Sequence, residues 1–271
     1  MLFRAVRHAY LLAGPPGVGR RALALRFAQA VNCTQPPQPG EPCGACRTCK
    51  QIEAMQHPDL SVVQAEREGG ALLIEQVRSL QQILSLAPYQ ARYRVALMLR
   101  FQEANDNAAN ALLKTLEEAP ARVILLLTVD SPEDVLPTIA SRCEVLRLRA
   151  LPVPAAAARL QQHWQMDAAQ ADLLAHISGG RLGYALRLAG DKDLREKREA
   201  LLDDLLRLLD APIRERFAYA EKKSKVRGGA REEREAVRAE LRLLFSLWLG
   251  LWRDVLLRSA GASAPLTNVD Y

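Results

Sequence analysis

The chain has 271 residues, of which 49% are hydrophobic and 25% are charged, and its net charge is +6. This balance is ordinary for a globular protein of two or three domains, and no apolar run reaches the roughly 20 residues that a membrane-spanning helix needs. The first residues lack the pattern of a signal peptide, so we expect a cytoplasmic protein without a membrane partner. The basic charge permits a nucleic-acid partner but also fits an arginine-rich genome.

Short apolar runs alternate with amphipathic segments in the first half of the chain. Strands are predicted at residues 10–13, 60–65, 94–99, 123–129 and 144–148, and helices at residues 21–31, 74–86 and 107–118. Residues 32–49 are rich in Pro, Gly and Cys and are expected to form an irregular insertion. Strands that alternate with helices predict an α/β fold with a parallel sheet covered on both faces.

The second half of the chain has a helical pattern from Pro152 to Gly261. We therefore predict three domains: an α/β domain at residues 1–150 with its insertion at about residues 32–50, a small helical domain at 151–205, and a helical bundle at 206–271. The densely charged stretch 221–238 is expected to be an exposed loop of that bundle.

A glycine-rich segment lies between the first predicted strand and the first predicted helix. Gly14, Gly17 and Gly19 match the glycines of a phosphate-binding loop, GxxxxGK[ST], in which backbone N–H groups hold phosphates at a helix N-terminus. Arg20 replaces the lysine that contacts the β- and γ-phosphates, and Arg21 replaces the hydroxyl that binds Mg²⁺. A cation in the second place repels the metal, so ATP binding is predicted to be residual or absent.

ATP hydrolysis also requires an acidic residue at the end of a neighbouring strand. The predicted strand 94–99 ends at Leu99 and is followed by Arg100, and the first acid, Glu103, comes beyond the strand end. The two defects together predict that the chain does not hydrolyse ATP and that the glycines shape a strand-to-helix turn. An active ATPase that uses Arg20 in place of the lysine is the alternative.

Four cysteines, Cys33, Cys43, Cys46 and Cys49, form the pattern C-x9-C-x2-C-x2-C. Four thiolates at this spacing close a tetrahedron around Zn²⁺ and leave no open position for catalysis. We therefore predict a structural zinc ion, with an iron–sulfur cluster or unliganded thiols as alternatives. Disulfides do not suit a cytoplasmic protein, and the fifth cysteine, Cys143, lies far along the chain.

Three further segments carry a family resemblance: HAYLL at residues 8–12, NALLKTLEE at 110–118 and SRC at 141–143. Together with the four cysteines they resemble the bacterial DNA polymerase III clamp-loader subunits of the AAA+ class, over residues 8–190. The resemblance implies an AAA+ sheet domain with a zinc module, a small helical lid domain and a C-terminal helical collar through which subunits assemble.

Within that family, the gamma/tau motor subunits have an intact GKT loop and an acidic pair after the strand. Arg20 and Arg21, with Leu99 and Arg100 in the register of that pair, make this chain similar to the non-hydrolysing delta-prime members. The chain is then not an enzyme itself, and the polymerase activity belongs to the holoenzyme. Such subunits act in the replisome at the bacterial nucleoid.

The resemblance also implies partners and one functional side chain. The partners are delta and gamma/tau subunits in a hetero-oligomeric ring that loads the β sliding clamp onto primed DNA. Arg142 would be an arginine finger that acts in trans on ATP held by a neighbouring gamma/tau subunit. A surface arginine at a strand end is the simpler alternative for Arg142. For the whole chain, a stand-alone zinc-dependent nucleic-acid-binding protein is the remaining alternative.

Several other motifs are expected to be structural. Residues 57–59, His-Pro-Asp, should form a turn before a strand, and residues 179–181, Gly-Gly-Arg, should join two helices. The charged residues Lys114, Glu117 and Glu118 are expected to be a solvated helix face near an interface, without a catalytic role.

Overall fold

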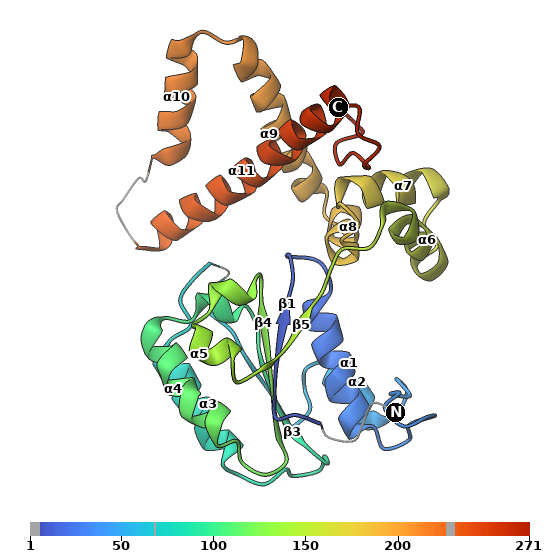
Figure 1. The fold of residues 1–271 in the computed structure, drawn as a ribbon, viewed down its shortest axis with the longest axis vertical. Coiled ribbons are helices and arrows are strands. Elements are labelled where there is room, and N and C mark those ends of the chain that lie inside the picture. The colour runs from blue at the N-terminus through green and yellow to red at the C-terminus, as the bar shows by residue number, and fades with distance from the viewer. Residues whose placement is uncertain (1–5, 68, 226–230) are drawn as a thin grey trace. The chain divides into compact units, whose positions relative to one another are not determined.

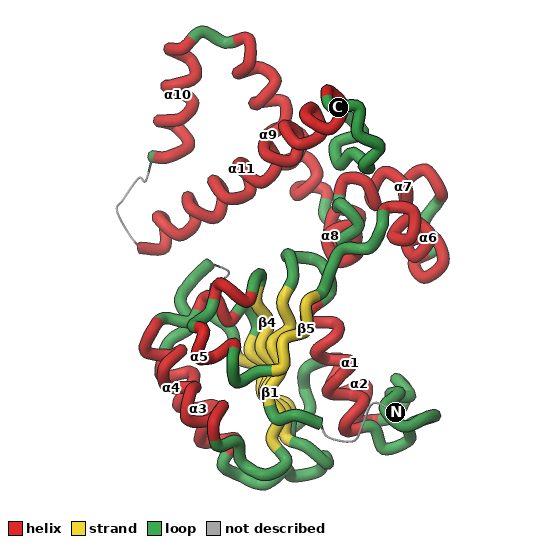
Figure 2. The backbone as a smooth tube through the Cα atoms, in the orientation of Figure 1, coloured by secondary structure: helices red, strands yellow, loops and turns green. Residues whose placement is uncertain are grey.

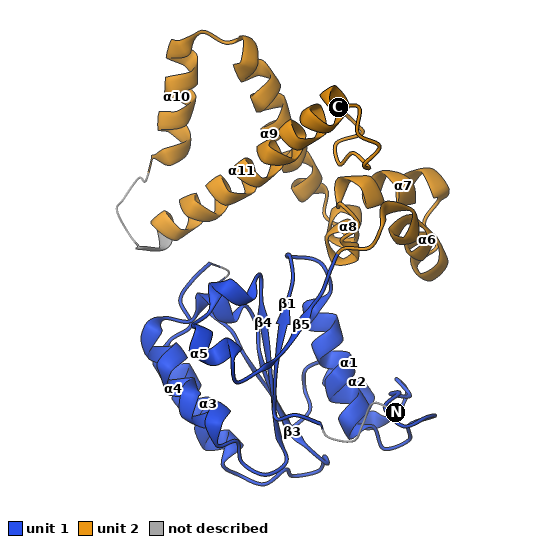
Figure 3. Ribbon diagram, in the orientation of Figure 1, with its two compact units in different colours: residues 1–149 blue, residues 150–271 orange. Residues whose placement is uncertain are grey.

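A computed structural model describes residues 6–67, 69–225 and 231–271 of the chain. The chain divides into two compact units, unit 1 at residues 1–149 and unit 2 at residues 150–271 (Figure 3). The division falls beside the predicted end of the α/β domain. The further split of the helical half into two domains stays a prediction.

Unit 1 contains a five-stranded parallel sheet with the strand order β2-β3-β4-β1-β5. The strands are β1 (Ala9–Ala13), β2 (Leu60–Val63), β3 (Arg94–Met98), β4 (Val123–Val129) and β5 (Glu144–Arg147). Every residue of β3 and β4 is buried, as a parallel sheet covered on both faces requires. The predicted α/β class is therefore confirmed.

Helices cover the two faces of this sheet (Figure 1). Successive strand residues point to opposite faces, so Leu11 belongs to one core and Leu12 to the other. The helices that pack on the Leu12 side are α1 (Arg20–Asn32) and α2 (Arg47–Glu53). Those on the Leu11 side are α3 (Ile74–Leu84), α4 (Asp106–Glu117) and the short α5 (Pro137–Ala140).

Helix α2 begins inside the segment that was predicted to be an irregular insertion. Cys46 is its N-cap residue, and the Cys46 Sγ accepts a hydrogen bond from the backbone N–H of Cys49 at 3.4 Å. Ile52 of this helix is buried in the core. The irregular pattern thus ends at the third cysteine and not at the fourth.

The His-Pro-Asp turn precedes β2 as predicted. The backbone N–H of Leu60 donates to the His57 carbonyl oxygen at 3.0 Å, and His57 Nδ1 accepts from the backbone N–H of Asp59 at 3.1 Å. Both His57 and Asp59 are buried. The turn therefore places a carboxylate inside the protein, beside the first residue of β2.

The Asp59 carboxylate organises the amino end of β3. It accepts hydrogen bonds from the backbone N–H groups of Tyr89, Gln90 and Ala91 at 2.7–2.8 Å. It also lies 3.2 Å from the guanidinium of Arg94, another buried side chain. Asp59 is thus a fully partnered buried carboxylate that fixes the segment leading into β3.

Unit 2 is helical throughout its ordered elements, in contrast to the strand-containing unit 1 (Figure 2). Its helices are α6 (Val153–Trp164), α7 (Ala168–Ile177), α8 (Leu182–Gly190), α9 (Lys192–Asp210), α10 (Ile213–Ser224) and α11 (Arg231–Ser259). Helices α6, α7 and α8 share one core cluster. Among the described helices, none has the length and apolar character of a membrane span.

The predicted junction at residues 179–181 joins α7 to α8. Gly180 has a positive φ of 77°, and a Cβ there would lie 1.8 Å from the Leu151 carbonyl oxygen. Only glycine fits this close approach. The Gly-Gly-Arg segment therefore joins two helices, as predicted.

Two features of unit 2 differ from the sequence expectation. Helix α9 continues without a break across the predicted boundary between residues 205 and 206. The loop expected at residues 221–238 is wrong for residues 221–224 and 231–238, which belong to α10 and α11; residues 226–230 lie outside the described part. Glu, Lys and Arg are good helix formers, and the ion pair of Lys223 with Glu240 at 3.0 Å joins the two helices.

Candidate functional sites at the two edges of the sheet

The glycine loop, residues 14–19, joins β1 to α1 at the carboxyl edge of the sheet. The backbone N–H of Gly14 donates to the carbonyl oxygens of Val129 and Asp130, at 3.2 and 3.1 Å. A Cβ on Gly14 would lie 2.6 Å from the Leu148 carbonyl oxygen, so this residue must be glycine. Gly19 has a positive φ of 110° at the start of α1. The glycines thus shape a strand-to-helix turn.

Arg20, the first residue of α1, is bound by an acid of the same chain. Its Nη2 lies 2.7 Å from Asp130 Oδ1, and its side chain is only 10% exposed. Asp130 directly follows β4, which lies beside β1. The cation that takes the place of a phosphate-binding lysine is therefore already neutralised, whereas Arg21 is exposed.

The end of β3 carries a second internal ion pair. Arg100 follows this strand with a positive φ of 50°, and its backbone N–H donates to Thr128 Oγ1 at 2.9 Å. Its Nε donates to both carboxylate oxygens of Glu103, at 3.0 and 3.1 Å. Glu103 also accepts from the backbone N–H of Gly69 at 2.8 Å. The nearest acid after β3 is thus engaged in fixing the loop, and a cation occupies the strand end.

Arg142 lies at the amino edge of the sheet, where the parallel strands begin, whereas the glycine loop lies at the carboxyl edge, where they end. It precedes β5, and the register pairs Tyr10 with Glu144 and Ala13 with Arg147. Because β1 and β5 are parallel, Arg142 is near the beginning of β1, while the glycine loop follows its end. A strand of five residues spans about 13 Å, so Arg142 is not part of the chain's own loop site.

The Arg142 guanidinium is held by two groups of unit 1. Its Nη1 donates to the Thr138 carbonyl oxygen at 2.8 Å, and its Nη2 lies 2.5 Å from Glu117 Oε1. About a third of the side chain, 34%, is exposed. Sequence reasoning treated Glu117 as part of a solvated face and missed this contact, because no spacing rule connects residues 25 positions apart.

All three segments of the family resemblance meet at this amino edge. Arg142 comes from the SRC segment and Glu117 from NALLKTLEE. His8, from HAYLL, has its Nε2 2.9 Å from the carbonyl oxygen of Leu116. Cys143 packs against the core, and burial raises the pKa of its thiol to about 12. The edge is therefore assembled from segments that are far apart in sequence.

The four cysteines of the insertion come together in unit 1. Their Sγ atoms all lie within 4.8 Å of one another, and those of Cys33 and Cys43 are 3.5 Å apart. A tetrahedral ion with metal–sulfur bonds of about 2.3 Å places its ligands about 3.8 Å from one another. Backbone N–H groups of Cys43, Cys46 and Cys49 each point at the Sγ of the preceding cysteine, at 3.3–3.4 Å. The cluster can hold a metal ion.

Helix α1 supports the cysteine cluster from one side. Gln29, which is buried, donates through Nε2 to the Cys49 carbonyl oxygen at 2.8 Å. Arg26 Nη1 in turn donates to Gln29 Oε1 at 3.1 Å. The cluster is therefore fixed to the same helix that begins at the glycine loop.

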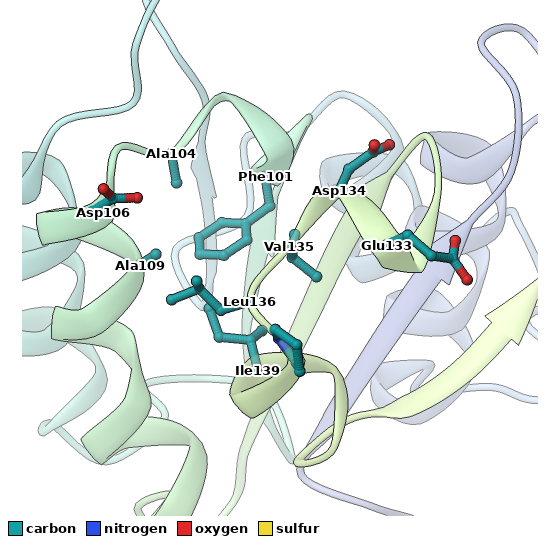
Figure 4. A pocket seen from close by; sticks show the side chains of 10 residues that line it. Phe101, Ala104, Asp106, Ala109, Glu133, Asp134, Val135, Leu136 and Ile139 are labelled. Atoms are coloured by element: carbon teal, nitrogen blue, oxygen red, sulfur yellow. The ribbon is translucent and has the colours of Figure 1, made fainter.

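A separate pocket lies beside the start of α4 (Figure 4). Apolar side chains, among them Phe101, Val135 and Leu136, line it, while the carboxylates of Asp106 and Asp134 stand at its rim. Its lining includes no residue of the glycine loop or of the cysteine cluster, and it does not include Arg142. The pocket is thus distinct from the predicted sites.

Comparison with known proteins identifies the family. The model of a family described as "DNA polymerase III, delta subunit" matches residues 4–152. A DNA polymerase III subunit delta' from Pseudomonas aeruginosa is 38% identical over 213 residues, which are 76% of this chain and 62% of that protein. The chain belongs to the DNA polymerase III delta-prime family. The resemblance found in the motifs is therefore confirmed.

Other relatives include both delta-prime and motor subunits. Subunit delta' of Bacillus subtilis is 32% identical over 195 residues, 72% of this chain and 57% of that protein. Subunit tau of the same organism is 31% identical over 193 residues, 69% of this chain and 34% of tau. The chain thus spans less than two thirds of the length of these relatives.

A structure similar to this family member is that of a DNA polymerase III gamma subunit-related protein from Thermotoga maritima. The TM-score is 0.44 at 19% sequence identity, and the match covers 90% of this chain and 73% of the other.

Proposed function

We propose that this chain is a non-hydrolysing clamp-loader subunit that completes the ATPase site of a neighbouring gamma/tau subunit with Arg142. The observation that carries the proposal is the position of Arg142, partly exposed and at the opposite sheet edge from the chain's own loop. From that position the guanidinium can contact a nucleotide bound to another chain more readily than a nucleotide bound at this chain's own glycine loop. Such a subunit contributes to catalysis in trans and is not itself an enzyme.

Two internal ion pairs support the absence of hydrolysis. Phosphoryl transfer needs a bound Mg²⁺ and an acid that orients water. Arg20 is instead neutralised by Asp130, and Arg100 follows β3 where that acid is needed. The phosphates of a nucleotide would have to compete with the Asp130 carboxylate for this cation. The proposal therefore gives ATP no role at this chain's own loop.

The proposed partners are delta and gamma/tau subunits, and through the complex the β sliding clamp and primed DNA. Replication takes place on the chromosome, so the proposed location is the bacterial cytoplasm. Residues 151–205 and 206–271 would be the lid and collar of such a ring subunit. In the collar segment, Phe245, Leu249, Trp252 and Leu256 are exposed large apolar residues spaced along one face of α11, as an assembly surface requires.

Zinc is the metal that we propose for the cysteine cluster. Four thiolates in a compact cluster match a structural Zn²⁺ site, which needs no open coordination position. Cys33, Cys43, Cys46 and Cys49 would hold the ion. Bound there, it would join the insertion to α2 and, through Gln29, to α1.

The test is reconstitution with gamma/tau and delta, followed by measurement of the ATPase stimulated by the clamp and primed DNA. Arg142→Ala should lower turnover at the site that Arg142 completes by about 10³-fold, the scale of an arginine finger. Arg147→Ala, which removes an exposed arginine from the other end of β5, is the matched control and should leave turnover unchanged.

Other outcomes would favour the alternatives. Wild-type turnover with Arg142→Ala would refute the finger. Hydrolysis by the purified chain alone, above that of an Arg20→Ala variant, would favour an active ATPase. Tight, salt-sensitive binding to primed DNA without partners would favour a stand-alone nucleic-acid-binding protein.

A further inference from the structure

We infer that Glu117 is the residue that positions the Arg142 guanidinium for its role in trans. The inference rests on the proposed function of Arg142. Glu117 Oε1 lies 2.5 Å from Arg142 Nη2, on the side not occupied by the Thr138 carbonyl oxygen, which accepts from Nη1. Two different nitrogens of one planar group are thus held at once, which fixes both the place and the plane of the guanidinium.

The place of Glu117 in its own helix is unfavourable without Arg142. Glu117 is the last residue of α4, and the C-terminus of a helix carries a partial negative charge. A carboxylate there is repelled, so local helix energetics do not explain an acid at this position. The positive charge of Arg142, brought in by the chain before β5, compensates both the carboxylate and the helix end.

The ion pair leaves Arg142 able to bind a second anion. A guanidinium has five N–H donors, and Thr138 and Glu117 engage two of them. The remaining donors and the exposed third of the side chain are available to a phosphate on a neighbouring subunit. An arginine that is ordered before the ring forms loses less rotamer entropy when the phosphate arrives, which favours the transition state.

The test uses the reconstituted ring with gamma/tau subunits whose own equivalent arginine is replaced by alanine, so that turnover reports the site completed by Arg142. Glu117→Ala is compared with Glu118→Ala, which removes the same charge from the next residue. We expect Glu117→Ala to lower kcat about 2- to 5-fold, the scale of a partly exposed ion pair, with little change in KM for ATP or in ring assembly. Glu118→Ala should behave as wild type.

The coupling of the two residues decides the inference. In an Arg142→Ala background, Glu117→Ala should cause no further loss, because no guanidinium remains to be positioned; a further loss would overturn the inference. If Glu117→Ala and Glu118→Ala had equal kcat while Arg142→Ala lowered turnover, the role of Glu117 would be overturned and the proposed function would stand. Wild-type turnover with Arg142→Ala would overturn both. If Glu117→Ala fails to fold, Glu117→Gln, which keeps the side-chain size, replaces it.

Discussion

At the carboxyl edge of the sheet, Arg20 is bound by Asp130 and Arg100 by Glu103, so both cations are neutralised within the chain. At the amino edge, Arg142 is also paired with an acid, but its side chain is 34% exposed, against 10% for Arg20 and 25% for Arg100. The same guanidinium group is therefore mostly buried in internal ion pairs at the carboxyl edge, and it is more accessible to a neighbouring subunit at the amino edge. The surroundings of each arginine, and not its charge, set what it can do.

The glycine loop, which we propose to be inactive, still needs its glycine at position 14 for a steric reason. Gly14 is required by the approach of the Leu148 carbonyl oxygen, whether or not a phosphate binds. The Gly14 N–H also joins the end of β1 to the end of β4, because it donates to the Val129 and Asp130 carbonyl oxygens. On its other side β1 pairs with β5, the strand that Arg142 precedes.

The largest expected effect is on the stability of the cysteine cluster, which adjoins the C-terminal end of α1, away from the glycine loop. Structural zinc contributes about 10 kcal/mol or more in small zinc modules, so removal of the metal should unfold the insertion. Metal analysis should find about one Zn²⁺ per chain, and chelation should lower the midpoint of thermal unfolding. Cys143→Ser is the matched control and should keep the metal. An iron signal, or an unchanged midpoint after complete removal, would contradict the zinc assignment.

A smaller effect is expected at the buried ion pair of the amino edge. Asp59→Asn leaves the buried Arg94 without its charge partner, which should lower the free energy of unfolding by about 3–5 kcal/mol in urea titrations. Glu144→Gln, which breaks the exposed pair with Arg7, should cost less than about 1 kcal/mol. Equal costs for the two variants would mean that the buried pair does not hold this edge together.

Acid should weaken the same edge in two steps. Burial lowers the pKa of His57, and the Asp59 charge only partly offsets this. Burial alone would raise the pKa of Asp59, but three backbone N–H groups and Arg94 outweigh it and lower the pKa. Both folded pKa values then lie below the unfolded values of about 6.5 and 3.9. This contribution to stability is complete above about pH 6.5 and is lost as the pH falls through each folded value.

The unfolding free energy measured from about pH 8 down to about pH 3 checks this sign. Asp59→Asn should remove the lower step, below about pH 4, because Asn does not titrate. An acid dependence identical to that of the wild type would assign the lower step to other carboxylates.

The last change, at the glycine loop, is expected to have no effect on ATP hydrolysis. Arg20→Lys combined with Arg21→Thr restores the glycine-loop motif but leaves Arg100 at the end of β3. Because no acid is added there, the purified double variant should release no more phosphate from ATP than the wild-type chain does. ATP turnover above that level would contradict the contrast between the two edges. It would show that Arg20 and Arg21 alone prevent hydrolysis at the carboxyl edge.

The sequence by itself determined the features whose chemistry is local. Cys43, Cys46 and Cys49 lie within one short segment, so their spacing alone predicts a shared ligand. The glycine spacing predicts the strand-to-helix turn, and the prediction for β4 has the observed bounds because β-branched and leucine residues follow one another there without a break. The charged stretch at 221–238 misled, because good helix formers are also typical of exposed loops.

Only the tertiary structure decided which charged groups meet. Glu117 contacts Arg142 across 25 residues, and His8 contacts Leu116 across 108. A parallel sheet brings such residues together because each crossover returns the chain to the same edge, and the strand register then selects the partner. The pairs Arg20–Asp130 and Glu117–Arg142 therefore follow from the order of the strands, which no local pattern contains.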